Sequence, residues 1–507
     1  MSRRWHKAAL PLLALSLLSG CVVSAPNSRP WLLDASAGTT VDNLPTSLEM
    51  ILPTARPAGA PYYTPTPDAP HALPALRTDG IQYIVQYGDY LSLIAQQYNL
   101  PVETLIAANP GINPDALEAG QIIFIPAPQA GLEISDFKII PDSELVYGPA
   151  SATLDVEAFV RQRGGYLNVY SEVVDGVTLS GAQIVQRISY EYSVNPRLLL
   201  ALLEYRSGWV TQAQPDPAYA TYPMGRFETS RDGLYKQLAW TADQLNHAYY
   251  LYQINGLSYV ILSDTSLVML SSVINPGTAA VQYLMAQLTD RAGYQLAISE
   301  SGVYAVYNSF FGIPFDRAVE PLLPSTLSQP VLRLPFEDGS TWSFTGGPHG
   351  GWGSGSAWAA LDFAPPGEAF GCVSSDAWVV AAADGLVVRS KDGAVVIDLD
   401  GDGLEQTGWT LLYMHVESRD RVSAGTYVKT GDRLGHPSCE GGVSNGTHLH
   451  FARRYNGEWI SADASLPFNL DGWLSSGDGV EYDGYLTRDG LTVTAWDGRI
   501  DENQIAR

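Results

Sequence analysis

Two histidines in a strand-like run, His448 and His450, stand two positions apart. Alternate side chains of a strand point to the same face, so both imidazoles could reach one metal ion and one substrate. Upstream, the sequence places His349, Asp362 and His415, each in a short motif of its own. Catalytic zinc commonly keeps three nitrogen or oxygen ligands and one water, whose pKa falls to about 7. Two histidines and one carboxylate meet this need, which predicts a hydrolytic zinc centre.

The two histidines that are not ligands could orient the water, exchange protons or hydrogen-bond the oxyanion formed when an amide carbonyl is attacked. A lone His-x-His pair is more often two ordinary strand residues, so the prediction depends on its context. That context is a set of motifs in fixed order: the Gly/Ser/Trp-rich stretch between His349 and Asp362, residues 379–388, residues 428–435, and Cys439-Glu440-Gly441-Gly442 before His448.

With these motifs, residues 332–476 resemble the lysostaphin-type zinc endopeptidases, which cut peptide cross-links of bacterial cell walls, and among them the staphylolysin branch. The resemblance implies a mostly antiparallel β domain with His349, Asp362 and His450 as zinc ligands. It makes His415 and His448 the catalytic histidines. Thirteen positions separate His349 from Asp362, where many relatives have a short His-x-x-x-Asp, and the longer loop suits the staphylolysin branch.

The predicted function is therefore that of a cell-wall hydrolase, a zinc-dependent endopeptidase acting on peptidoglycan peptides. Two alternatives remain open: a non-catalytic wall-binding regulator of another hydrolase, and an enzyme that cleaves glycan strands. The formal net charge of -24 and the lack of basic runs argue against nucleic acid as a partner. A length of 507 residues suggests about three domains.

The N-terminus predicts export. Residues 1–20 carry basic residues followed by the apolar run Ala8–Leu18, which is typical of a signal peptide. Leu18-Ser19-Gly20-Cys21 resembles the bacterial lipoprotein box, which implies lipidation of Cys21 and an anchor on the extracytoplasmic face of a membrane. The alternative, an uncleaved membrane helix, would need about 20 apolar residues. Residues 21–80 are rich in Pro, Ala, Ser and Thr and predict a tether that reaches the cell wall.

Residues 81–126 predict a small strand-helix-helix-strand unit and resemble the LysM module over its whole length. LysM modules bind glycans that contain N-acetylglucosamine. By this resemblance the glycan would lie between the turn with Gly88, Asp89 and Tyr90 and the loop with Asn113. Tyr90 could instead pack in the core of the module.

Residues 150–325 are mostly helical by periodicity. The stretch 194–209 resembles the first active-site helix of lytic transglycosylases and related lysozyme-like folds. Arg206 stands where those enzymes carry their catalytic acid, and a guanidinium does not release its proton at any useful pH. Glu204 lies about 200° away around a helix. We therefore expect an inactive lysozyme-like domain that still holds glycan; a degenerate active glycosidase and a plain helical spacer remain alternatives.

Beyond Cys21, the chain has only Cys372 and Cys439. An exported domain meets an oxidising compartment, so we expect these two residues to form a disulfide. Two reduced, buried thiols are the alternative.

Two further segments are weaker signals. Asp398, Asp400 and Asp402 alternate as in the opening of a calcium loop, but Trp409 stands where a bidentate Glu is expected. Calcium binding and a solvated acidic turn are both open. Residues 477–507 predict a hairpin turning at Asp489-Gly490, with no chemistry assigned.

Overall fold

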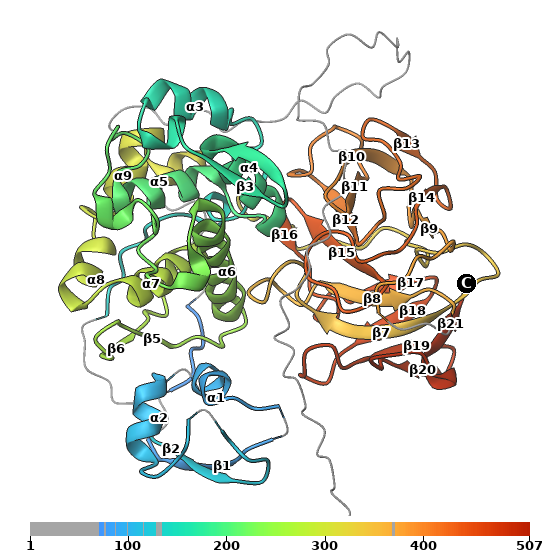
Figure 1. Cartoon of the computed structure of the whole chain (residues 1–507), viewed down its shortest axis with the longest axis horizontal. Coiled ribbons are helices and arrows are strands. Elements are labelled where there is room, and N and C mark those ends of the chain that lie inside the picture. Colours follow the sequence, from blue (N-terminus) through green and yellow to red (C-terminus); the bar gives the residue numbers. More distant parts are fainter. Residues whose placement is uncertain are drawn as a thin grey trace, which may run out of the picture.

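The computed structural model describes residues 70–507 except 76–77, 87, 99, 115, 128–133 and 368–370. Cys21, the export segment and most of the expected tether lie outside these residues. Three units follow one another along the described chain: a small module, a helical domain and a β domain (Figure 1). Across the described part of the chain, no helix has the length and apolar character needed to cross a membrane.

The small module has the predicted strand-helix-helix-strand order. Its two strands pair in antiparallel fashion, with Ile81 opposite Ile125. Asn109 ties the end of the second helix to the closing strand, because its amide exchanges hydrogen bonds with the backbone of Phe124. The elements are β1 (Ile81–Ile84), α1 (Leu91–Gln97), α2 (Val102–Ala108) and β2 (Ile122–Ile125).

The helical domain is built on one apolar core whose residues run from Ile139 to Leu322. At its centre lies α5, whose residues Pro196–Leu203 are all buried. Two hairpins extend from the helices. The elements are α3 (Val156–Arg163), β3 (Ser171–Val174), β4 (Val177–Ser180), α4 (Gly181–Tyr192), α5 (Pro196–Ser207), α6 (Leu234–Gln253), β5 (Tyr259–Ile261), β6 (Leu267–Met269), α7 (Pro276–Leu288), α8 (Arg291–Ala297) and α9 (Val303–Phe311).

Local sequence signals set the ends of these helices. Ser180 and Gln183 form a reciprocal capping box at the start of α4. The side chain of Asn195 accepts a hydrogen bond from the backbone N–H of Arg197, and Pro196 occupies the first turn of α5. Gly208 ends α5 with a left-handed backbone, which glycine adopts without steric cost.

The β domain centres on a nine-stranded antiparallel sheet in the order β13-β10-β11-β12-β15-β8-β7-β21, with β16 paired to β15. Further pairs are β14-β9 and the four-stranded β17-β18-β19-β20. The strands are β7 (Thr341–His349), β8 (Ala360–Ala364), β9 (Val379–Val380), β10 (Gly385–Lys391), β11 (Ala394–Asp398), β12 (Trp409–Met414), β13 (Tyr427–Val428), β14 (Arg433–Gly435), β15 (Leu449–Tyr455), β16 (Glu458–Trp459), β17 (Asn469–Leu470), β18 (Trp473–Ser476), β19 (Tyr485–Arg488), β20 (Leu491–Thr494) and β21 (Gln504–Ala506).

The register of the central strands gathers the residues singled out from the sequence. His450 on β15 lies directly opposite Asp362 on β8 and, on its other side, opposite Met414 on β12. His415 follows Met414 at the end of β12, and His349 closes β7 next to β8. The metal-type side chains therefore meet at one end of four neighbouring strands.

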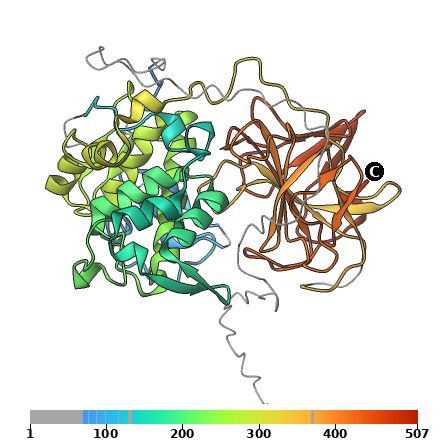
Figure 2. The ribbon, with the colours of Figure 1, turned by 90° about the horizontal axis from the view of Figure 1, so that it is seen from above.

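The helical domain packs against the β domain, as the two views in Figures 1 and 2 show. The β15–β16 hairpin makes much of the contact. The backbone N–H of Trp459 donates to Tyr250 Oη at 2.9 Å, and Gln253 Nε2 donates to Glu458 Oε1 at 2.8 Å. Ser193 Oγ donates to the carbonyl of Gly457. Backbone and side-chain bonds together make this a specific interface.

The C-terminal tail forms the predicted hairpin. Strands β19 and β20 pair with Arg488 opposite Leu491, so Asp489 and Gly490 are the two turn residues, and both have positive φ. Leu486 and Val493 of this hairpin belong to the core of the β domain.

Burial raises the pKa of Glu458 to about 7 from 4.5, against the lowering effect of hydrogen bonds from Gln253 and Tyr249. A carboxyl whose folded pKa lies above its unfolded value binds more protons when folded, so stability falls as pH rises between those values. We expect Glu458→Gln to remove this loss, worth about 3 kcal/mol at 1.36 kcal/mol per pKa unit. Calorimetric melting temperatures of both proteins from pH 4 to 8 should converge at low pH and diverge at pH 8; parallel curves would contradict this prediction.

Candidate metal centre

Three ligand-type atoms from three strands face one another at the end of the sheet. His349 Nε2 lies 2.9 Å from His450 Nδ1, and Asp362 Oδ1 lies 3.2 Å from the former and 3.3 Å from the latter. All three residues are largely shielded from solvent, with His349 2% and Asp362 8% exposed. They form a cluster of metal-ligating type.

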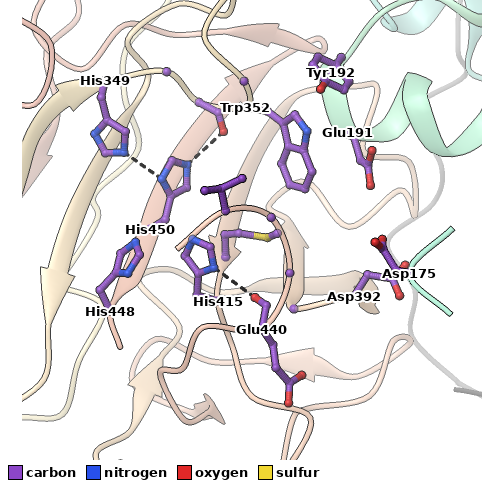
Figure 3. Close-up of a pocket in the computed structure, with 18 of the residues that line it drawn as sticks. Asp175, Glu191, Tyr192, His349, Trp352, Asp392, His415, Glu440, His448 and His450 are labelled. Atoms are coloured by element: carbon purple, nitrogen blue, oxygen red, sulfur yellow. Dashed lines mark hydrogen bonds between the residues drawn. The ribbon is translucent and has the colours of Figure 1, made fainter. Parts of the chain in front are cut away.

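The second nitrogen of each imidazole faces a backbone carbonyl. His349 Nδ1 lies 2.8 Å from the oxygen of Gly347, and His450 Nε2 lies 3.1 Å from the oxygen of Gly351. Figure 3 shows the rings of His349 and His450 next to each other, joined by a dashed line. A carbonyl only accepts hydrogen bonds, so each of these nitrogens carries the hydrogen. The nitrogens that face Asp362 therefore present lone pairs.

The cluster thus holds two lone pairs and a carboxylate in mutual contact. Two neutral rings and a carboxylate would repel one another here. Against the lowering effect of burial, Asp362 raises the pKa of His349, so either a proton on His349 or a metal cation relieves the repulsion. Asp362 Oδ1 is also buried without a hydrogen-bond partner, which is costly for a carboxylate. Bonds of about 2.0–2.1 Å from zinc to nitrogen and oxygen suit atoms spaced about 3 Å apart. The donor set and its spacing fit zinc with one open position.

His415 and His448 stand beside this cluster, with ring centroids 4.4 Å apart. His448 Nε2 lies 3.7 Å from Asp362 Oδ2. Their Nδ1 atoms face carbonyls: that of Glu440 at 3.1 Å for His415 and that of Gly446 at 2.7 Å for His448. Both Nε2 atoms are therefore left for the substrate.

Burial sets the charge state of His415. Burial first, and then the neighbouring His448 and His450, lower the pKa of His415 well below its usual value. The ring is therefore neutral near pH 7 and keeps a lone pair on Nε2. His415 also has a positive φ of 65°, an uncommon backbone conformation that is frequent at functional sites.

Cys372 and Cys439 form a disulfide with Cα atoms 5.7 Å apart. Cys439 directly precedes Glu440, whose carbonyl oxygen faces His415 Nδ1. The disulfide therefore anchors the turn that orients His415.

Sequence reasoning missed two residues of the C-terminal tail. The ring of Tyr482 stacks on His349 with centroids 4.3 Å apart, and Tyr482 has a φ of 70°. Glu481 accepts a hydrogen bond from the N–H of Gly350 at 3.3 Å. The dense Gly and Asp residues of 477–484 signal tight turns, but no motif in them shows that the turns reach the metal centre.

A cavity of about 600 Å³ opens before the histidines, and both domains line it. The helical domain contributes Asp175, Glu191 and Tyr192 among others, and the β domain contributes Asp392 opposite the histidine cluster (Figure 3). The helical domain is therefore one wall of the cleft in which a substrate would meet the metal.

The architecture and the site define a metallopeptidase that carries two accessory domains. Residues 366–462 match the model "Peptidase family M23", residues 83–126 match "LysM domain", and residues 138–323 match "LasA, N-terminal domain". The chain thus carries an M23-type metallopeptidase domain, preceded by an N-terminal LysM domain and a helical LasA-type middle domain. Its cofactor is zinc.

Three known proteins illustrate what the chain is similar to. The chain is 28% identical over 361 residues to "Protease LasA" of Pseudomonas aeruginosa strain PAO1, covering 66% of this chain and 79% of the relative. It is 26% identical over 167 residues to "Beta-lytic metalloendopeptidase" of Lysobacter enzymogenes, covering 32% and 90%. The solved structure of the M23 metalloprotease pseudoalterin is 28% identical and covers 34% of this chain and 97% of that chain, with a TM-score of 0.28.

Three of the expected glycan-binding residues, Gly88, Asp89 and Tyr90, lie on one turn of the LysM module. Tyr90 is 67% exposed, so it does not pack in the core. Gly88 has a φ of 91°, and Asp89 accepts hydrogen bonds from Tyr83 Oη and from the N–H of Gln86. Asp89 therefore shapes the turn that presents Tyr90.

The acidic turn after β11 brings one carboxylate oxygen each of Asp398, Asp400 and Asp402 within 4.8 Å of one another. Backbone N–H groups of the same turn donate to all three carboxylates. Burial, with the neighbouring carboxylates, raises the pKa of Asp398 to about 7. Glu405 turns away to pair with Arg389 and Arg454, so it supplies no further ligand. Calcium binding here stays a prediction.

We expect metal removal to destabilise the β domain, because the free energy of zinc binding to the folded site is then lost. Zinc at about 1,000 times its Kd would add roughly 4 kcal/mol. Calorimetry after chelation should show a lower melting temperature that zinc restores. In Asp362→Asn the melting temperature should respond little to zinc; equal zinc responses in both proteins would argue against this cluster as the metal site.

Proposed function

We propose that this zinc endopeptidase, which cleaves the peptide cross-links of peptidoglycan, uses His349, Asp362 and His450 as its metal ligands. His415 and His448 act on the substrate. The observation that carries the proposal is the trio of facing acceptor atoms, flanked by two imidazoles whose Nε2 atoms are left unbonded to the backbone.

Zinc, when bound, supplies an acidified water and polarises the scissile carbonyl. The neutral ring of His415 begins with a lone pair on Nε2 and can take the proton of the attacking water there. The same nitrogen then carries N–H and passes the proton to the leaving amine. His448 stands next to it, and the lone pair on its Nε2 can accept a hydrogen bond from the attacking water and so orient it. The carbonyls of Glu440 and Gly446 hold both rings in the tautomer that this proton transfer needs.

The accessory domains hold the wall in this proposal. The exposed Tyr90, with Gly88, Asp89 and Asn113, binds an N-acetylglucosamine-containing glycan. The helical domain is a lysozyme-like scaffold without glycosidase activity. Glu204 accepts hydrogen bonds from the N–H groups of Val210 and Thr211, which commits its carboxylate to the turn after α5.

Arg206 supports the same view of the helical domain. Its guanidinium donates to the carbonyls of Met224 and Leu288, so it acts as a structural donor at the position where an acid would be needed. The chain acts outside the cytoplasm, and lipidation at Cys21 would anchor it to the membrane beside its substrate.

The direct test is release of free amino groups from purified peptidoglycan. We expect His450→Ala to lose both zinc and cleavage. His448→Ala and His415→Ala should keep stoichiometric zinc but turn over about 10²–10⁴-fold more slowly, the range for general acid–base groups. Zinc content is measured on the same preparations by atomic absorption.

The rival functions predict other outcomes. A wall-binding regulator would bind zinc and peptidoglycan yet release no amino groups in any form. A glycan-cleaving enzyme would release reducing ends or anhydro sugars, and Glu204→Gln would abolish them while His450→Ala would not.

A further inference from the structure

The loop between β7 and β8 reaches from the metal centre to the helical domain. Its first residues include Gly351, whose carbonyl oxygen accepts from His450 Nε2 at 3.1 Å. Its tip, Ser354 and Gly355, contacts α6 of the helical domain. One short loop thus touches both a proposed metal ligand and the neighbouring domain.

A single carboxylate holds the tip of this loop. Asp243 on α6 accepts from the N–H of Gly355 at 2.8 Å through Oδ1 and from Ser354 Oγ at 3.0 Å through Oδ2. Within the described residues Asp243 makes no ion pair, and apart from a longer bond of 3.5 Å from Gln244 Nε2, these loop donors are its side-chain hydrogen-bond partners. A charged acceptor makes such bonds stronger than neutral ones.

The contact is too close for ordinary side chains. A Cβ on Gly355 would lie 1.9 Å from the backbone oxygen of Asp243, and a Cβ on Gly351 would lie 2.5 Å from the ring of Trp459. Trp459 in turn donates from Nε1 to the carbonyl of Tyr192 in the helical domain. Glycine at these two loop positions allows the loop to lie directly on its supports.

The loop is stiff between the two contacts. The N–H of Gly351 donates to Ala357 O at 3.0 Å, and the N–H of Trp352 donates to Ser356 Oγ at 3.0 Å. A displacement of the tip is therefore transmitted to the Gly351 carbonyl. That carbonyl fixes the tautomer and orientation of His450, as partners of metal-bound histidines commonly do.

We propose that Asp243 of the helical domain is a positioning residue for the metal centre, acting through the loop tip and the Gly351 carbonyl on His450. The helical domain then belongs to the catalytic unit, beyond any role in holding glycan. The proposal rests on His450 as a ligand but does not depend on which bond the enzyme cuts.

The test measures zinc release to a chelator from the full chain, without substrate. We expect Asp243→Ala to release zinc about 10-fold faster than wild type, the lower end of the range for outer-shell partners. Asp243→Asn should stay close to wild type, because its carbonyl oxygen can accept from Gly355 and its amide can donate to Ser354 Oγ. This rescue separates hydrogen-bond geometry from the loss of charge.

Gln253→Ala is the matched control, since Gln253 also lies on α6 and bonds to the β domain, through Glu458 at 2.8 Å, but does not touch the loop. It should lower the melting temperature while leaving zinc release unchanged. Three outcomes would overturn the proposal. Asp243→Ala could release zinc at the wild-type rate, Asp243→Ala and Gln253→Ala could accelerate zinc release equally, or Asp243→Asn could fail to restore the wild-type rate. Because no substrate is present, these results stand apart from any failure of peptidoglycan cleavage.

Discussion

The close approach of three buried ligand-type atoms is the constraint on which the rest of the structure depends. His349 Nε2, Asp362 Oδ1 and His450 Nδ1 approach within 2.9–3.3 Å of one another. Neighbouring strands fix their backbones, and carbonyl oxygens turn both imidazoles so that lone pairs point inward. Holding these three atoms together lowers the stability of the fold, and a bound cation restores it. This is how a protein makes a strong metal site.

The β sheet can hold this geometry because it is buried on both sides. One face covers the domain's own core, and the other packs small residues such as Ala359, Ala394 and Ala452 around Met414 and Trp459. Tyr250 of the helical domain packs against this second cluster. The helical domain therefore completes the burial of the strands that carry the ligands and also walls the cleft before them.

The sequence predicted much of the site because strand periodicity and motif order are local signals. The alternation of His448 and His450 and the turn at Asp489-Gly490 needed no tertiary information. Tyr482 and Asp243 could not be found in the same way. Each reaches the site through contacts between segments distant in sequence, one through a turn against β7 and the other through a domain interface. Solvent-facing aspartates on helices are common, so nothing local distinguished Asp243.

Strand β21 pairs with the start of β7, with Gln504 opposite Ser343. Strand β7, which ends in His349, is synthesised long before β21. Its outer edge therefore stays unpaired until the rest of the domain has been synthesised. An open strand edge is a template for pairing with other chains. Strand β21 therefore covers the outer edge of β7 near its start, and folding intermediates or forms cleaved between β20 and β21 would expose unpaired backbone groups of the strand that ends in His349.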